Sequence, residues 1–118
     1  MVEEITFAKW FEHQYLEWQA STESRQTIDD FAKWLGFKRP TVNLWMNGNT
    51  TPGRASADRL ALKLGCDVYK LLGIPPSDLR LVNVEVNWPT LSDELRSRIA
   101  EQVERYLKEH PQDYKPEG

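Results

Sequence analysis

The sequence predicts an all-α protein: a block of five short helices, then an extended linker or short strand, then one amphipathic helix near the C-terminus. Three observations support this fold class. Apolar residues recur at spacings of three and four in six separate segments, which is the periodicity of helices with one buried face. Four of the six glycines directly follow such a segment, where glycine commonly ends a helix. Only in residues 79–88 do apolar and polar residues loosely alternate, which is the pattern of a strand.

The first predicted helix covers residues 6–20 and has a wide aromatic face. Exposed rings in such a row can stack on single-stranded bases. We instead predict that they fill the core, because a small domain needs large apolar side chains to bury. The rings belong to Phe7, Trp10, Phe11, Tyr15 and Trp18.

Residues 27–36 predict a short helix with signals at both ends. Thr27 is placed to cap its start, with Asp30 as a weaker substitute for the usual Glu or Gln of a capping box. Gly36 is suited to end it in a left-handed conformation. The inward stripe consists of Ile28, Phe31, Ala32 and Leu35.

A second helix is predicted almost at once, over about Arg39–Asn47. Val42, Trp45 and Met46 form its inward face. At about 100° per residue, the opposite face is mainly polar and starts with two basic residues. That face carries Lys38, Arg39, Pro40, Thr41, Asn43, Leu44 and Asn47.

Two further helices, ended by Gly65 and Gly73, complete the first block. Pro75 and Pro76 then stop the pattern, because successive prolines cannot continue a helix. We therefore predict a helical domain over residues 1–74 and a second part over residues 75–118.

The second part ends in an amphipathic helix that begins near Thr90 or Ser92 and is followed by a polar tail from His110. Two roles are open for it: a dimer contact with a second copy, or packing against its own domain. Its candidate dimer positions are Leu95, Ile99, Val103 and Tyr106.

A net charge of −3 conceals a basic region. Residues 25–63 hold seven basic and three acidic side chains. By contrast, residues 1–24 hold one basic and five acidic side chains, and residues 64–118 hold seven basic and ten acidic ones. The positive field is therefore confined to the second to fourth helices, where it would attract phosphate.

Composition favours a cytoplasmic binding protein without catalytic activity, cofactor or metal. No apolar run is long enough to cross a bilayer, and Glu3 and Glu4 stand where a secretory signal would be basic. Cys66 is the single cysteine, which excludes a thiolate metal cluster, and its position after Gly65 predicts a small buried residue. The sequence has no arrangement typical of nucleophilic catalysis, no metal-ligand spacing and no phosphate-binding loop.

Residues 27–52 resemble the helix-turn-helix of the lambda-repressor and Cro-like family, also called the XRE family of bacterial and phage regulators. The resemblance extends over about residues 7–73. It implies a five-helix lambda-repressor-like domain whose third helix enters the DNA major groove. The residues that carry it are the Phe31-Ala32 pair, Gly36, the Val42-to-Trp45 spacing, Gly48 and Pro52.

Side-chain chemistry on the third helix agrees with this resemblance. Arg39 can make a bidentate contact to guanine, Asn43 suits adenine, and Leu44 or Pro40 can meet a thymine methyl. The expected base contacts are Arg39, Pro40, Thr41, Asn43 and Leu44, and the expected phosphate contacts are Thr27, Lys38, Asn47 and Asn49. We therefore expect a sequence-specific transcriptional regulator that binds double-stranded DNA as a homodimer. The alternative is an antitoxin-like or other protein-binding module that holds a partner through residues 79–118, with DNA binding secondary.

Overall fold

The computed structural model describes residues 5–111. Over that range every regular element is a helix and none is a strand, which confirms the all-α prediction. Of the polar tail predicted from His110 on, residues 112–118 lie outside the described residues, as do Glu3 and Glu4. In chain order the elements are α1 (Phe7–Ser21), α2 (Ile28–Leu35), α3 (Arg39–Met46), α4 (Arg54–Leu64), α5 (Asp67–Leu72), α6 (Leu79–Asn87), the 3₁₀-helix η1 (Trp88–Thr90) and α7 (Asp93–Glu109).

Two compact units make up the chain, one ending at Asn83 and the other starting at Val84. The sequence placed the boundary earlier, after residue 74. Residues 74–78 are not helical, but a side chain of α4 forms hydrogen bonds with this segment. Arg54 Nη1 donates to the Pro75 carbonyl at 2.6 Å and to Ser77 Oγ at 3.2 Å. The segment after the prolines therefore begins as part of the first unit.

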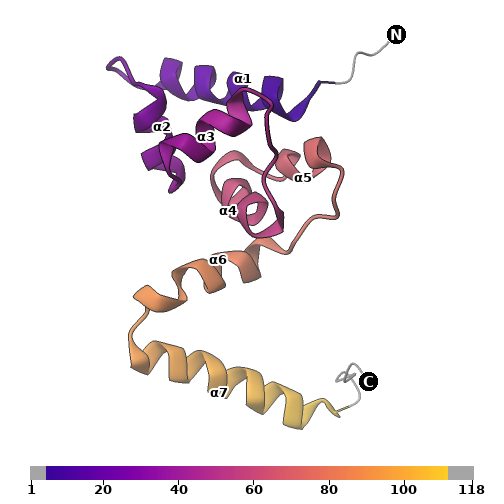
Figure 1. Cartoon of the computed structure of the whole chain (residues 1–118). Helices are drawn as coiled ribbons and strands as arrows, with labels where there is room; N and C mark the ends of the chain where they lie inside the picture. Colours follow the sequence, from indigo (N-terminus) through magenta and orange to yellow (C-terminus); the bar gives the residue numbers. More distant parts are fainter. Residues whose placement is uncertain (1–4, 112–118) are drawn as a thin grey trace. The chain divides into compact units, whose positions relative to one another are not determined.

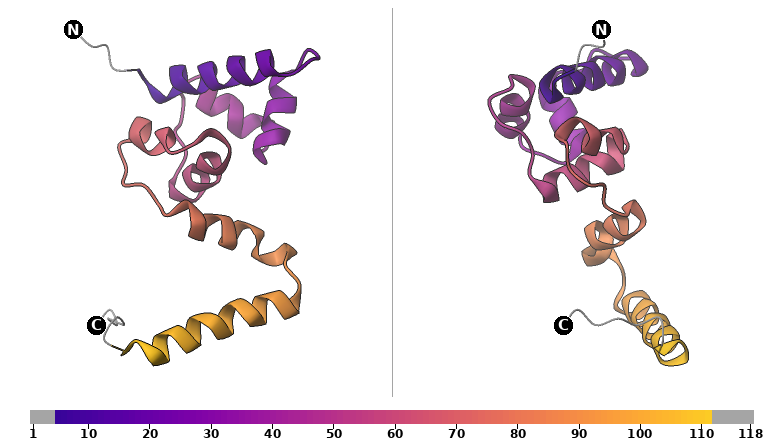
Figure 2. Two further views of the ribbon diagram at one scale, coloured as in Figure 1. Left: turned by 180° about the vertical axis from the view of Figure 1, so that it is seen from behind. Right: turned by 90° about the vertical axis from the view of Figure 1, so that its right-hand side faces the viewer.

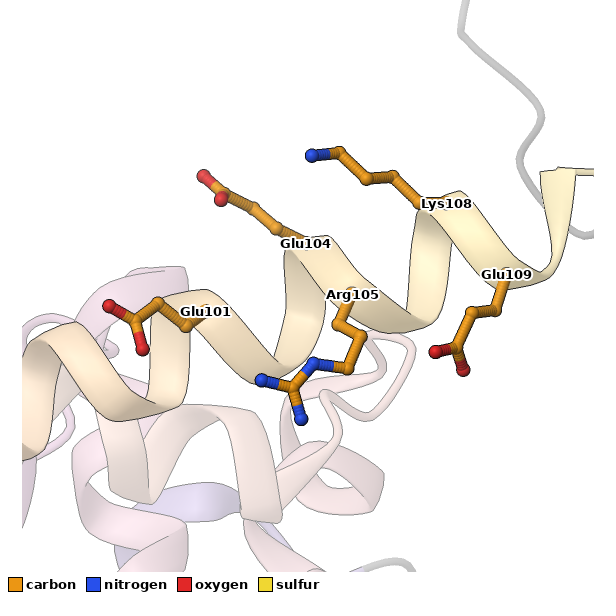
Figure 3. Close-up of a pocket in the computed structure, with 5 residues that line it drawn as sticks. All are labelled: Glu101, Glu104, Arg105, Lys108 and Glu109. Atoms are coloured by element: carbon orange, nitrogen blue, oxygen red, sulfur yellow. The ribbon is translucent and has the colours of Figure 1, made fainter.

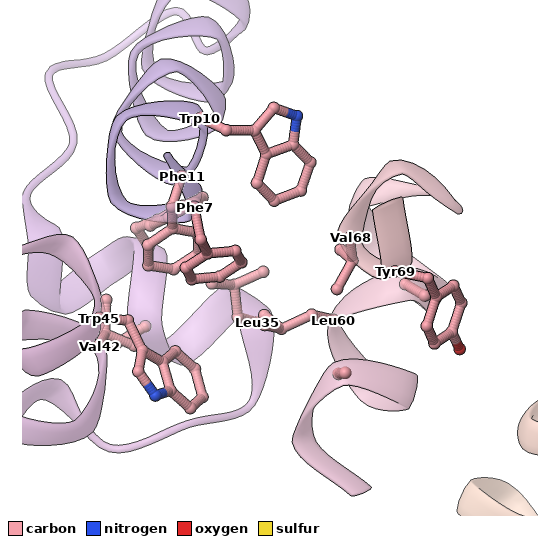
Figure 4. Close-up of a cluster of buried hydrophobic side chains, with 13 residues drawn as sticks. Phe7, Trp10, Phe11, Leu35, Val42, Trp45, Leu60, Val68 and Tyr69 are labelled. Carbon is pink, nitrogen blue, oxygen red and sulfur yellow. The ribbon is translucent and has the colours of Figure 1, made fainter. Parts of the chain in front are cut away.

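The first unit is built on an aromatic core. Phe7, Trp10 and Phe11 of α1 are buried in it, as the spacing of the rings predicted. The Phe11 ring centroid lies 5.6 Å from that of Phe31 and 6.1 Å from that of Trp45. Figure 4 shows the α1 rings beside Trp45 and facing residues of α4 and α5. Each large side chain buried in this way stabilises the fold by about 1.5–3 kcal/mol.

The packing of the five N-terminal helices leaves one side of α3 free. α1 packs on α2, α3 and α5, while α2 packs on both α3 and α4. Figures 1 and 2 show α1 running across the unit, with α2 and α3 beside one half of it and α5 beside the other. The α2–α3 pair is therefore supported by α1 and α4, and the remaining face of α3 points outward.

The predicted strand over residues 79–88 is wrong, because Leu79–Asn87 forms α6. Alternating valines suggested an extended segment, but a lone strand leaves its backbone groups unpaired, whereas a helix satisfies them internally. Helical spacing also serves burial: Leu79 packs against the core of the first unit, and Val82, three residues later, is 5% exposed. The extended linker is thus limited to residues 74–78.

Cys66 also differs from its prediction, because it is exposed. Gly65, with φ of 92°, turns the chain out of α4, so Cys66 occupies the N-cap position of α5 outside the core. Val68 and Tyr69 take the buried positions instead. Among the described helices, none is long and apolar enough to cross a membrane.

Candidate nucleic-acid interface

The α2–α3 pair is fixed by the end signals predicted from the sequence. The Asp30 amide donates to Thr27 Oγ1 at 3.2 Å and the Thr27 amide donates to Asp30 Oδ2 at 3.0 Å, which completes the capping box. Gly36 ends α2 with φ of 87°, and its amide donates to the Ala32 carbonyl at 2.9 Å. The chain therefore reverses in a short turn, and α3 begins at Arg39.

Packing divides α3 into an inner and an outer face. Val42 and Trp45 are 0% and 4% exposed, and Met46 packs beside the core. Every residue predicted to contact bases is at least partly exposed to solvent. Arg39, Pro40 and Leu44 are exposed, as are Lys38, Asn47 and Asn49 nearby, whereas Thr41 and Asn43 are half-buried.

The start of α3 carries positive charge that no described residue compensates. Lys38 is the N-cap residue and makes no side-chain capping bond, and the first turn holds no acidic residue. Within residues 5–111, the side chains of Lys38 and Arg39 form no hydrogen bond or ion pair. Cations at a helix N-terminus oppose the positive end of the helix dipole, so this placement disfavours folding locally. An anion placed there would meet two side-chain charges and free backbone amides together.

Four other basic residues of the positive region, Lys33, Arg54, Arg59 and Lys63, have partners inside the first unit, whereas Arg25 forms no hydrogen bond or ion pair with the described residues. Lys33 pairs with Asp29 at 3.3 Å, and the Lys63 ammonium lies 5.3 Å from the Trp34 ring centroid. Arg59 Nη2 donates to the Gly36 carbonyl at 2.7 Å. Within the described part of the positive region, the basic side chains without a partner are therefore the adjacent Lys38 and Arg39 at the start of α3, and Arg25 before α2.

Thr27 differs from the other predicted phosphate contacts because its polar groups are already used. Its hydroxyl donates to Asp30 Oδ2 at 2.9 Å and its amide donates to the same oxygen. These hydrogen bonds, that of the Thr27 amide first, hold the pKa of Asp30 below its ordinary value. A carboxylate therefore stands at the start of α2, where it would repel a phosphate.

A second candidate surface is the apolar stripe of α7. Ser92 caps this helix by accepting a hydrogen bond from the Leu95 amide at 3.1 Å, as one of the two predicted caps. None of its residues is buried within the described structure. Leu95, Val103 and Tyr106 are 38%, 55% and 51% exposed, and Ile99 is half-buried.

A shallow hollow lies on the surface of α7. Its lining side chains all project from this one helix and include three acidic and two basic residues (Figure 3). In the described part of the chain, no three His, Cys, Asp or Glu side chains gather in a way that could hold a metal ion. The lining consists of Glu101, Glu104, Arg105, Lys108 and Glu109.

Comparison with known proteins identifies no relative of this chain. No protein-family model matches it, and neither a curated protein nor a solved structure does. Its function must therefore be argued from its own residues.

One residue of this region was missed by sequence reasoning. Arg59 counted only as one of seven basic residues, yet it binds the turn between α2 and α3 from a distance of 23 positions along the chain. No local pattern marks such a contact, because it depends on how α4 packs beside α2.

Proposed function

We propose that this protein is a sequence-specific transcriptional regulator that binds double-stranded DNA, with α3 as the helix that enters the major groove. One observation carries the proposal: α3 presents a polar outer face that begins with the unpartnered cations Lys38 and Arg39. Folding gives no reason for this charge, whereas DNA supplies phosphates to neutralise it and base edges for the side chains beyond.

The order of the helices supports the same function. The first unit includes α1–α5, of which the second and third are joined by a tight turn. The resemblance of the sequence to lambda-repressor-like domains implies the same order of helices. In that arrangement the N-terminal residues of the third helix meet the bases. We infer the same docking here.

Base reading is assigned to the outer face of α3. Arg39 would contact guanine and Asn43 adenine, each with a bidentate pair of hydrogen bonds that discriminates by about 1–3 kcal/mol. Thr41 would bond either type of base, and Pro40 and Leu44 would meet thymine methyl groups. Two or three such contacts give useful selectivity when two copies bind together.

Phosphate contacts are assigned to Lys38, Asn47 and Asn49, which are exposed around α3. For Thr27 the capping box supports a structural role, because its hydroxyl and amide are bonded to Asp30. We therefore expect Thr27 to affect DNA binding only through the start of α2.

A homodimer in the cytoplasm, with no catalytic activity, is the form in which we expect the protein to act. One recognition helix covers few base pairs, and two copies would read half-sites about 34 Å apart. The exposed stripe of Leu95, Ile99, Val103 and Tyr106 supports α7 as the contact between copies. Deleting residues 89–118 and measuring mass in solution tests this role, since a truncated protein that is still a dimer contradicts it.

The same stripe favours a second candidate function. A helix with no buried residue can hold a different protein, as in an antitoxin that covers its toxin, with DNA binding secondary. A stable complex purified from the native host, identified by mass spectrometry and lost in Val103→Glu, would support this alternative. A clean homodimer from the same preparation argues against it.

The decisive experiment selects bound sequences from a pool of random duplexes and measures their affinity by gel shift. Arg39→Ala and Asn43→Ala are expected to relax the selected sequence at separate base positions, each by about tenfold in discrimination. Lys70→Ala is the matched control, because it removes an exposed cation from α5 and not from α3. If both α3 variants keep the wild-type preference, α3 does not read the bases.

A further inference from the structure

Arg59 links three parts of the first unit that are separate in sequence. From α4, its guanidinium donates to the Gly36 carbonyl at 2.7 Å and lies 4.5 Å from the centroid of the Phe37 ring. That ring in turn meets Trp45 of α3 edge to face, with centroids 5.0 Å apart at 75°. A continuous contact therefore runs from α4 through the turn to the inner face of α3.

The contact acts on the rotation of α3 about its own axis. Trp45 is the large buried residue of α3, and the Phe37 ring contacts both it and the guanidinium of Arg59. Side-chain atoms on the outer face of a helix lie about 5–6 Å from its axis, so a rotation of about 10° moves them by about 1 Å. A displacement of that size breaks hydrogen bonds, whose distance range is narrower.

Arg59 is otherwise available to make this link. Among the described residues it has no acidic partner, and the neighbouring Asp58 instead accepts a hydrogen bond from the Tyr69 hydroxyl at 2.7 Å. Lys63, one turn further along α4, lies on the Trp34 ring and does not reach the turn. Arg59 and Lys63 therefore have different structural roles.

We propose that Arg59 is a positioning residue for base reading: it clamps the α2–α3 turn to α4 and so sets the rotation of the outer face of α3. The inference rests on the proposed DNA-binding function. It assigns sequence discrimination to a residue that touches no base.

The test separates positioning from phosphate binding by comparing Arg59→Met, Arg59→Lys and Lys63→Met. Each variant is measured on the duplex selected by the wild type and on a scrambled duplex over a salt series. Lys63→Met removes one cation from the same helix without touching the turn, and thermal unfolding shows that each variant is folded. Lysine keeps the charge but lacks the planar group that stacks and donates in this geometry.

Positioning predicts that Arg59→Met and Arg59→Lys both lose discrimination between the two duplexes, by about tenfold. The salt slope of Arg59→Met should equal that of Lys63→Met, because each has lost one cation. The salt slope of Arg59→Lys should equal that of the wild type. If Arg59→Met weakens both duplexes equally, lowers the salt slope by about one and is rescued by lysine, Arg59 is a phosphate contact and the proposal is overturned. Unchanged discrimination in both variants overturns it as well.

A measurement without DNA keeps this test independent of the proposed function. In amide NMR spectra of the full chain, Arg59→Lys should shift residues of the turn and of α3, whereas Lys63→Met should act around Trp34. A wild type that enriches no duplex refutes DNA binding, and the spectra then still decide whether Arg59 orients α3. Unshifted α3 amides in Arg59→Lys refute the clamp whatever the wild type binds.

Discussion

Replacing Gly36 with alanine tests the α2–α3 turn at its most constrained backbone position. Gly36 has φ of 87° and ψ of 27°, a left-handed conformation that costs an L-residue about 1–2 kcal/mol. An added Cβ would also lie 3.0 Å from Arg59 Nη2, so the guanidinium would have to shift by a few tenths of an ångström, which weakens its hydrogen bond to the Gly36 carbonyl. Weakening that hydrogen bond adds at most about 0.5–1.5 kcal/mol. The expected total loss is about 1.5–3.5 kcal/mol.

Gly73→Ala is the matched control, because Gly73 also has a positive φ, of 67°, but an added Cβ there meets no atom within 4 Å. Gly73→Ala should be destabilised only by the backbone cost. The stability loss of Gly36→Ala should therefore exceed that of Gly73→Ala by about 1 kcal/mol. For a domain of this size that is a difference of about 4–8 °C in Tm. Thermal and urea unfolding followed by circular dichroism measure both variants.

The double variant Gly36→Ala/Arg59→Met assigns the extra loss to its cause. With Arg59 already removed, adding alanine at position 36 should cost no more than Gly73→Ala does, because residues in contact give non-additive effects. Equal losses in Gly36→Ala and Gly73→Ala would refute the argument, since Arg59 would then exert no constraint on the turn.

Three further outcomes are expected. Phe31→Ala should lose about 3–5 kcal/mol in urea unfolding, because the Phe31 ring is fully buried among other rings. The pKa of Asp30 is lowered by its hydrogen bonds from Thr27, so its stabilising effect is present above an ordinary pKa of 3.8 and is lost as the pH falls through the folded-state pKa. Asp30→Asn should therefore flatten the acid end of the stability profile, and a profile as steep as the wild type's would contradict this. Lys38→Gln should reduce the salt slope of DNA binding by about 0.9 per protomer, whereas Lys70→Gln should leave it unchanged in the same titration.

The elements of the first unit could be predicted because their signals are local. Thr27, Asp30 and Gly36 mark both ends of α2 within ten residues, and the apolar spacing of α1 identifies its buried face. The same signals located α3 to within one residue at its C-terminal end. Patterns of this kind reflect the geometry of one helix and need no knowledge of its neighbours.

Features that depend on neighbours could not be predicted in this way. The valines of α6 alternate like a strand, and the helix is favoured by the surroundings: the described chain offers no partner strand, and helical spacing lets Leu79 and Val82 pack. Tyr69 is buried although it ends in a hydroxyl, because Asp58 on α4 accepts its hydrogen bond. Burial and this hydrogen bond raise the pKa of Tyr69. The Arg59 clamp belongs to the same group of long-range contacts.

The two helices of the α2–α3 pair begin with opposite charge, since α2 starts beside the Asp30 carboxylate and α3 starts beside Lys38 and Arg39. Under the proposed function, a polyanion diffusing towards this unit would be drawn to the start of α3 more strongly than to the start of α2. Such steering acts on the rate of association, which falls steeply with ionic strength, more than on the rate of dissociation. The capping box would then orient the encounter as well as start a helix.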